Sequence, residues 1–316
     1  MPSPTRILQS IQPYVFTTLI GKKRLIEAEG HRVIDLSLGS PDQPMPPALI
    51  ESIAAAARDT RSHGYPVMTG EMAFHEAFAG FMQRRFGVSL DIPSEVVPTA
   101  GAKEALANVV AAYCEPGDAM LTADVAYPVY ERAVAASGAD VVRMPVRAAE
   151  QYWPDLDAIT AADAARAKFL LLNFPNNPTG AVTTRERWAE AVEWCRRNDV
   201  ILISDIAYSE LVQHGDPAPS VFEVEGAREV AIEVHSGSKN FSMAGMRLGV
   251  VCGRRDVITA LNSYRTLVGY GVPTVVQRAG AFAFAHAEEL SRGIREGYRE
   301  RFAAAVQGFA DAGVTV

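Results

Sequence analysis

The feature that most constrains the fold of this chain is an alternation of short apolar runs with longer amphipathic segments, beginning near residue 95. Most of the runs are apolar almost throughout, which is typical of strands buried on both faces of a parallel sheet. Helices are expected between them, and this order predicts a doubly wound α/β domain. The predicted helices are Ala102–Tyr113, Tyr127–Ser137 and Thr184–Asn198, and the predicted strands are Glu95–Pro98, Ala119–Thr122, Asp140–Met144, Lys168–Asn173, Val200–Asp205, Val230–His235 and Arg247–Cys252.

The two ends of the chain do not follow this alternation. The first forty residues contain an apolar arm around Tyr14, and a short strand is predicted at Val33–Leu38. After residue 274 the pattern is helical, with helices expected at Arg278–Phe284, Ala287–Arg295 and Tyr298–Ala310. The last residues, Gly313–Val316, have the composition of a strand that is beginning.

The composition argues against several classes of protein. The 316 residues carry 30 basic and 37 acidic side chains, a net charge of −7, so nucleic acid is not expected as the main partner. Three cysteines, Cys114, Cys195 and Cys252, match neither a disulfide framework nor a metal motif. The N-terminal residues lack the apolar stretch of a signal peptide, and no apolar run approaches the roughly 20 residues that span a bilayer. We expect a cytoplasmic protein with no metal and no membrane partner.

Polar side chains follow three of the predicted strands at the point where each strand ends. Asn177 comes shortly after Lys168–Asn173, Asp205 and Tyr208 come at the end of the next strand, and Lys239 comes after Val230–His235. In an open α/β sheet, ligands bind outside the carboxyl ends of the strands. Each of these residues alone is more simply explained as a turn or helix-cap residue, but together they predict a binding pocket.

A phosphate site is predicted at the start of the Ala102–Tyr113 helix. Gly101 precedes this helix, and a glycine there lets an anion approach the free N–H groups of the first turn. Ser236 and Arg247 can supply a hydroxyl and a guanidinium to the same phosphate.

These residues meet the chemical needs of pyridoxal 5′-phosphate. The cofactor requires an amine for its Schiff base (Lys239), a carboxylate beside its pyridine nitrogen (Asp205), donors to its phenolate oxygen (Asn177 and Tyr208) and a flat partner for its ring (Tyr127). The glycine-rich turns of dinucleotide-binding and P-loop proteins are absent from the sequence.

The stretch from Ser236 to Gly249 resembles the lysine signature of the class I/II aminotransferases, a family of pyridoxal-phosphate fold type I. The resemblance covers essentially the whole chain and includes further blocks in the family's order, which are Leu38–Asp42, Tyr65–Gly70, Thr99–Lys103, Ala126–Pro128, Asn176–Gly180 and Asp205–Tyr208. It implies a mostly parallel central sheet sandwiched by helices, plus a small α/β domain built from both termini. The implied division is an N-terminal arm and small-domain segment at 1–40, a large cofactor-binding domain at 41–285 and the start of a C-terminal small domain at 286–316.

The resemblance also implies a role for each site residue. Lys239 binds the cofactor and then moves a proton between substrate and cofactor, with Asp205 and Tyr208 completing the catalytic set. Tyr65 reaches the cofactor phosphate of a neighbouring subunit, so a homodimer is expected. Gly39, Tyr14 and Asn177 face the substrate. The implied cofactor-binding set is Gly101, Ala102, Lys103, Tyr127, Asn177, Asp205, Tyr208, Ser236, Ser238, Lys239, Arg247 and Tyr65.

Within the family the sequence is most similar to the LL-diaminopimelate aminotransferase branch and its alanine- and aspartate-specific relatives. Leu267 or a neighbour stands where that branch has an asparagine, which favours a shorter substrate than diaminopimelate. Family members continue beyond residue 316 and carry there the arginine that binds the substrate carboxylate. We therefore expect a truncated chain that binds cofactor but transaminates poorly.

The expected activity is transfer of an amino group between an α-amino acid and a 2-oxo acid by a ping-pong Schiff-base mechanism, in amino-acid biosynthesis. The alternative within the same fold is a C–S or β-lyase, which would use the same residues. A third possibility, from another class, is a cofactor-binding regulatory or scaffold protein. Formation of the pyridoxamine form of the cofactor, or release of pyruvate and ammonia, distinguishes the first two.

Overall fold

The protein is described by a computed structural model that covers residues 2–10, 15–36 and 39–314. Its main helices are α1 (Arg6–Ser10), α2 (Val15–Ala28), α3 (Pro47–Arg58), α4 (Met72–Phe86), α5 (Ala102–Tyr113), α6 (Val129–Ser137), α7 (Ala161–Arg166), α8 (Arg185–Asn198), α9 (Ala227–Val230), α10 (Gly237–Asn240), α11 (Arg255–Val268), α12 (Thr274–Ala285) and α13 (Ala287–Asp311). Its strands are β1 (Val96–Thr99), β2 (Ala119–Ala123), β3 (Asp140–Met144), β4 (Ala167–Asn173), β5 (Ile201–Asp205), β6 (Ala231–Ser236) and β7 (Gly249–Gly253).

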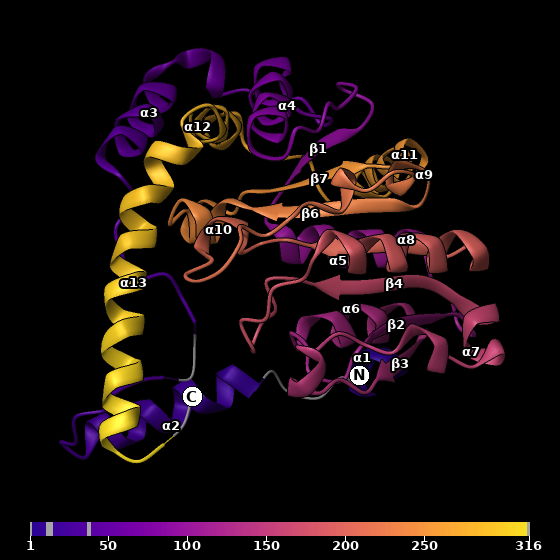
Figure 1. Ribbon diagram of the computed structural model, residues 1–316. Helices are drawn as coiled ribbons and strands as arrows, with labels where there is room; N and C mark the ends of the chain where they lie inside the picture. The colour runs from indigo at the N-terminus through magenta and orange to yellow at the C-terminus, as the bar shows by residue number, and fades with distance from the viewer. Residues whose placement is uncertain (1, 11–14, 37–38, 315–316) are drawn as a thin grey trace.

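The strands of these described residues form one seven-stranded sheet in the order β1-β7-β6-β5-β4-β2-β3 (Figure 1). Strand β7 runs antiparallel to both of its neighbours, and the other pairs are parallel. The predicted mostly parallel α/β fold is therefore confirmed, and each of the seven predicted strands lies within two residues of its observed bounds.

Two apolar layers cover the two faces of the sheet, which explains why the strands read as almost continuous apolar runs. In β4, Phe169 and Leu171 belong to the core cluster beneath α5, α6 and α11, whereas Leu170 and Leu172 belong to the cluster beneath α4, α8 and α12. All four side chains are buried. Because successive side chains of a strand point to opposite faces, a strand covered on both sides needs apolar residues at every position.

The strand predicted at Val33–Leu38 is wrong for the residues that the structure describes. Residues 33–36 have no regular secondary structure, and Ile34 and Leu36 are 76% and 89% exposed. A strand without a neighbour to share its backbone hydrogen bonds is not stable, and no partner strand lies beside this segment among the described residues. Of the strand predicted at the other end, residues 315 and 316 lie outside the described part of the chain.

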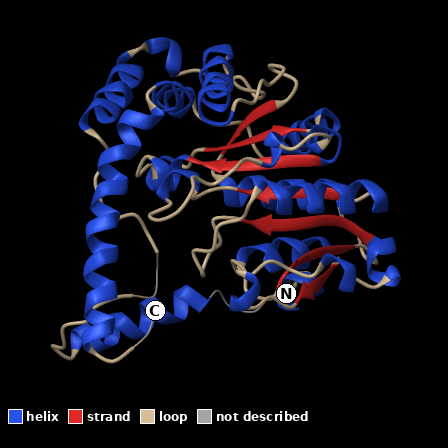
Figure 2. Ribbon diagram, viewed as in Figure 1, coloured by secondary structure: helices blue, strands red, loops and turns tan. Residues whose placement is uncertain are grey.

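Helix α13 joins the last two predicted helices into one of 25 residues. Gly297 lies between them and does not interrupt it, since a glycine costs a helix only about 1 kcal/mol. The helix runs along the side of the molecule toward which the arrows of β4 and β6 point (Figure 1 and Figure 2). It contacts α10 and the 3-10 turn Ser209–Leu211, both of which follow strand ends. Helix α13 therefore lies beside the edge of the sheet at which the parallel strands end.

We predict that Trp188→Ala lowers the free energy of unfolding by about 3–5 kcal/mol. Trp188 is fully buried in α8, packs edge-on against Trp153 and Phe174, and donates from Nε1 to the carbonyl of Pro219 at 3.3 Å. Urea denaturation followed by circular dichroism measures the change. The control Arg196→Ala, on the exposed face of the same helix, should shift the value by less than about 0.5 kcal/mol. Equal unfolding midpoints for the two variants would contradict this account of the core.

Candidate active site

Lys239 lies in α10, the short helix that begins where β6 ends. Its Nζ donates to the carbonyl oxygen of Gly39 at 2.8 Å and stands 5.7 Å from the ring centroid of Tyr208. Burial lowers the pKa of this amine below its ordinary value. A larger share of the amine is therefore unprotonated at neutral pH than for a surface lysine, which is the form that attacks a carbonyl.

Asp205 is the last residue of β5 and is buried. One carboxylate oxygen accepts from the Tyr130 hydroxyl at 2.7 Å and the other from the Ala207 N–H at 3.1 Å. Burial raises the pKa of this carboxyl, while the hydrogen bond from Tyr130 opposes the shift. Both donors are neutral, so a pyridinium N–H beside Asp205 would supply the opposite charge that a buried carboxylate requires.

Tyr130 was missed by the sequence analysis. It lies three residues after Tyr127, near the start of α6, and the two rings stand 5.6 Å apart at 89°. Burial and the neighbouring Asp205 raise the pKa of Tyr130 well above its ordinary value, so it remains a hydrogen-bond donor. Its position three residues after Tyr127, the proposed ring-stacking tyrosine, was the one signal for Tyr130 in the sequence, and it does not reveal the contact with Asp205.

The predicted phenolate donors come together in the structure. Asn177 donates from Nδ2 to the hydroxyl oxygen of Tyr208 at 3.3 Å, which leaves the hydroxyl hydrogen free to point elsewhere. Burial, followed by the nearby Asp205, raises the pKa of Tyr208 to about 12, so the hydroxyl stays protonated. Asn173 holds the pair in place, since it accepts from the Asn177 backbone N–H at 2.7 Å and donates to the Asp205 carbonyl at 2.8 Å.

The phosphate cradle is built on two glycines. Gly101 caps α5 with a φ of +93°, and a Cβ added there would lie 2.4 Å from a guanidinium nitrogen of Arg247. A Cβ added at Gly249 would lie 2.6 Å from the backbone nitrogen of Ala102. The first turn of α5 and the Arg247 guanidinium thus face the same small space, where free N–H groups and a positive fork suit a phosphate. Lys103 lies in the same turn with an exposed side chain.

Ser236 and Ser238 border this cradle from the side of β6. The Ser236 hydroxyl oxygen accepts from the Ser238 backbone N–H at 3.2 Å and so caps α10, and both side chains are buried. Two predicted residues are not brought into this group. Tyr65 is 85% exposed and packs on Tyr270 at 4.5 Å, and Tyr14 lies outside the described residues.

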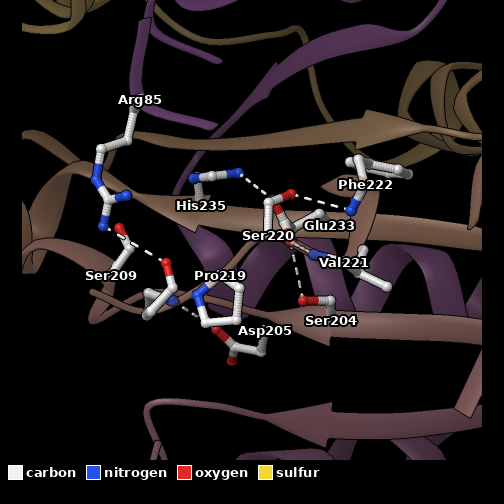
Figure 3. Close-up of polar contacts among 12 residues, drawn as sticks. Arg85, Ser204, Asp205, Ser209, Pro219, Ser220, Val221, Phe222, Glu233 and His235 are labelled. Carbon is white, nitrogen blue, oxygen red and sulfur yellow. Dashed lines mark hydrogen bonds and ion pairs between the residues drawn. The ribbon is translucent and has the colours of Figure 1, made fainter. Parts of the chain in front are cut away.

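A buried carboxylate, Glu233, lies behind the site (Figure 3). It accepts hydrogen bonds from Ser204 at 3.1 Å, Ser220 at 2.9 Å, the Val221 N–H at 3.0 Å and His235 at 2.9 Å. Ser204 directly precedes Asp205 and His235 directly precedes Ser236, so Glu233 fixes the ends of both strands. Ligand atoms of Glu233, His235 and Cys252 also lie within 4.8 Å of one another. Since the Glu233 oxygens are already filled by protein donors, this group is structural.

The residues present fit pyridoxal phosphate. The cradle suits a phosphate, the neutral donors to Asp205 leave room for a cationic ring nitrogen, and the Lys239 amine lies beside Tyr208 at the same edge of the sheet. A fold and site of this kind define a pyridoxal-phosphate-dependent enzyme. The chain belongs to the class I and II aminotransferase family, whose pattern matches residues 31–316.

Similarity to known proteins, which extends over most of this chain, supports the same assignment. The chain is 40% identical to an LL-diaminopimelate aminotransferase of Moorella thermoacetica over 306 residues, which cover 96% of this chain and 78% of that protein. A second enzyme of the same name, from Aquifex aeolicus, is 38% identical over 93% of this chain and 76% of its own length. An aspartate aminotransferase mutant of Thermus thermophilus superposes with a TM-score of 0.92 at 28% identity, covering 99% of this chain and 81% of that one. The protein is a pyridoxal-phosphate-dependent aminotransferase.

We predict that Gly249→Ala weakens the binding of pyridoxal phosphate by about tenfold or more, equivalent to about 1.4 kcal/mol. The added methyl group meets the backbone of Gly101 and Ala102 at 2.6 Å, so the start of α5 has to move away from Arg247. Absorption titration of the apo-protein measures the dissociation constant. The matched control is Gly245→Ala, where nothing lies within 4 Å of the new Cβ and affinity should not change. Equal affinities for both variants would show that the close approach does not shape the cradle.

Proposed function

We propose that this protein transfers the amino group of an α-amino acid shorter than diaminopimelate, such as aspartate or alanine, to a 2-oxo acid by a ping-pong mechanism. The observation that carries the proposal is the position of the Lys239 amine, 2.8 Å from the Gly39 carbonyl and over the Tyr208 ring. A substrate amino acid bound between Gly39 and the sheet edge would place its α-carbon within reach of this amine.

The chain's own residues then have distinct tasks. Bound pyridoxal phosphate supplies a sink for the electrons released at the substrate α-carbon. Lys239, whose pKa is lowered by burial, would take the α-proton and return it. Asp205 holds a positive charge at the ring nitrogen, while Tyr208 and Asn177 donate to the phenolate oxygen. The phosphate would be bound by the N–H groups of Ala102 and Lys103, next to Gly101, and by side chains of Ser236, Ser238 and Arg247, and the Tyr127 ring would stack on the cofactor.

One feature of this chain favours a substrate shorter than that of the relatives reported above, which include enzymes named for LL-diaminopimelate, a molecule with two polar ends. In this chain the last two residues of α11, Leu267 and Val268, are 78% and 57% exposed, in the region where the family resemblance implies an asparagine. Apolar side chains offer no partner to a distal ammonium or carboxylate, so a long polar substrate would leave its far end unpaired.

A second copy of the chain is the proposed partner. Six large apolar side chains are at least half exposed on one region of the molecule, namely Tyr65, Val67, Met72, Leu267, Val268 and Tyr270. Tyr65 and Tyr270 pack on each other, and a Cβ at Gly271 would lie 3.3 Å from Met68, so these segments form one apolar patch. A patch of this kind marks an interface, and a homodimer would bury it and direct Tyr65 toward the neighbouring phosphate.

We also propose the division into an arm and small-domain segment at 1–40, a large domain at 41–285 and a small-domain segment from 286. It is supported by the sheet, whose strands all lie between residues 96 and 253. A cytoplasmic location is proposed because all three cysteines are free and buried. No helix in the described part of the chain is both long and apolar enough to cross a membrane.

We predict that the purified protein develops a visible absorption band with pyridoxal phosphate, that Lys239→Ala abolishes this band, and that aspartate or alanine bleaches it faster than LL-diaminopimelate. The lysine is needed because it carries the cofactor, and bleaching reports amino transfer. Lys168→Ala, which removes an exposed lysine paired with Asp118, is the control and should keep the band. A band that every amino acid leaves unchanged would oppose the proposed half-reaction, and a preference for LL-diaminopimelate would overturn the short-substrate proposal.

We predict that Leu267→Glu weakens the dimer by about thirtyfold or more, the effect of about 2 kcal/mol at an interface hot spot. The substitution places a charge where an apolar side chain would be buried by the second copy. Sedimentation equilibrium of the holo-protein measures the association. Ile50→Glu, an equally drastic change at a 44% exposed position of α3, serves as the control. A wild-type protein that sediments as a monomer would refute the homodimer.

A further inference from the structure

The phosphate cradle is fixed from behind by a carboxylate that takes no part in binding the phosphate. Glu104, in the first turn of α5, accepts a hydrogen bond from the backbone N–H of Ala100 at 2.9 Å. The Ala100 carbonyl in turn accepts from Arg247 at 3.3 Å. Glu104 also accepts from the side-chain amide of Asn108, one turn further along the helix. The loop 99–101, which presents the cradle, is thereby tied to the body of α5.

Glu104 is paired with a buried arginine from another helix. Arg265, in α11, is 3% exposed, and its Nε stands 3.7 Å from a carboxylate oxygen of Glu104. Burial lowers the pKa of this guanidinium, and the charge of Glu104 opposes the shift. A second branch of the same guanidinium donates to the carbonyl oxygen of Met68 at 3.5 Å. Arg265 thus contacts Glu104 through Nε and the segment 65–70 through a terminal guanidinium nitrogen.

The segment 65–70 has few other anchors among the described residues. The buried Gln277 donates to the Val272 carbonyl at 2.7 Å and to the Val67 carbonyl at 3.5 Å, and it accepts from the Glu71 N–H at 2.7 Å. Its other support comes from Tyr270 and Gly271 and, at the end of the segment, from His75 and Pro98, which lie against Gly70. Tyr65 itself is left on the surface. The position of this segment therefore depends on the few polar contacts that hold its carbonyl oxygens.

We propose that Arg265 is a positioning residue that couples the phosphate cradle of its own subunit to the Tyr65 segment that serves the neighbouring subunit. Binding of phosphate at the cradle fixes Ala100 and, through its N–H, the carboxylate of Glu104. Glu104 in turn fixes the guanidinium of Arg265, and the guanidinium fixes the carbonyl of Met68. The consequence rests on the proposed homodimer, because a segment ordered in this way helps to bind cofactor at the second site. Filling one site thereby favours filling the other.

An arginine suits this task better than a lysine would. Its planar fork presents donors in fixed directions, so one buried side chain can contact two acceptors on different segments at once. A lysine keeps the charge but concentrates its donors on a single nitrogen at the end of a flexible stem. Arg265→Lys therefore keeps the buried charge beside Glu104 while separating the two contacts, and it avoids leaving Glu104 without a positive partner.

The test is hydrogen exchange, read by mass spectrometry for the amides of residues 67–71, with and without saturating pyridoxal phosphate. Tyr65→Phe serves as the background, since it removes the tyrosine hydroxyl that would contact the neighbouring phosphate directly. We expect the cofactor to slow exchange in this segment by about fivefold or more in Tyr65→Phe, the lower end of usual couplings. The double variant Tyr65→Phe/Arg265→Lys should lose this protection. The control Tyr65→Phe/Arg255→Lys, at a 62% exposed position of the same helix, should keep it.

Two results would overturn the coupling, namely absence of protection in Tyr65→Phe and retention of protection in the Arg265→Lys double variant. Either of them, seen together with a visible band that requires Lys239, would leave the proposed function standing. If no band formed with Lys239 intact, the proposed function and the coupling would both fall. If the protein sedimented as a monomer, the benefit to a second site would be refuted, while the exchange measurement would still decide the link within one chain.

Discussion

The hydrogen bond between Tyr130 and Asp205 is the interaction on which the site depends most. A carboxylate at the end of a buried strand loses its hydration, and two neutral donors compensate only part of that cost. The part of the desolvation cost that these donors do not offset makes the Asp205 carboxylate a strong partner for a cationic ring nitrogen. The same bond joins α6 to β5, so the start of α6, two residues after Tyr127, is positioned by the carboxylate that is proposed to bind the ring nitrogen.

Behind this bond lies a second polar layer that fixes the strand ends. Glu233 receives four hydrogen bonds from three segments, and the residues next to two of its donors are Asp205 and Ser236. The four donors hold the Glu233 carboxylate and their own segments in one arrangement, because moving any one segment leaves a buried charge less well solvated. The apolar core sets the distance between the sheet and the helices that cover it. Glu233 fixes the position of the end of β5 relative to the end of β6.

Local patterns predicted a large part of this structure, and long-range contacts account for what they missed. The helix at Ala102–Tyr113 and the strand at Asp140–Met144 were predicted with their observed bounds, because Gly101 and the apolar runs are local signals. Tyr130 and Asp205 are 75 residues apart, and Arg265 meets a carbonyl 197 residues away, so no pattern in the sequence reveals either contact. The strand expected at 33–38 failed for a related reason, since a strand requires a partner that local sequence does not name.

The two sides of the site are held with very different strength. On the cofactor side, Gly101 and Gly249 allow backbone and guanidinium to approach so closely that no methyl group fits, and the buried Arg265 lies behind them, paired with the partly exposed Glu104. On the substrate side, the segment that carries Gly39 is fastened to α13 by the Asp42–Arg301 pair at 2.5 Å, in which both side chains are more than half exposed, and by Gln43, which donates to the Ile294 carbonyl at 3.2 Å. An exposed pair of this kind contributes little to stability, because water and salt screen the two charges. A ping-pong enzyme keeps its cofactor while substrates and products alternate, so a rigid phosphate side and a loosely fastened substrate side match the proposed reaction.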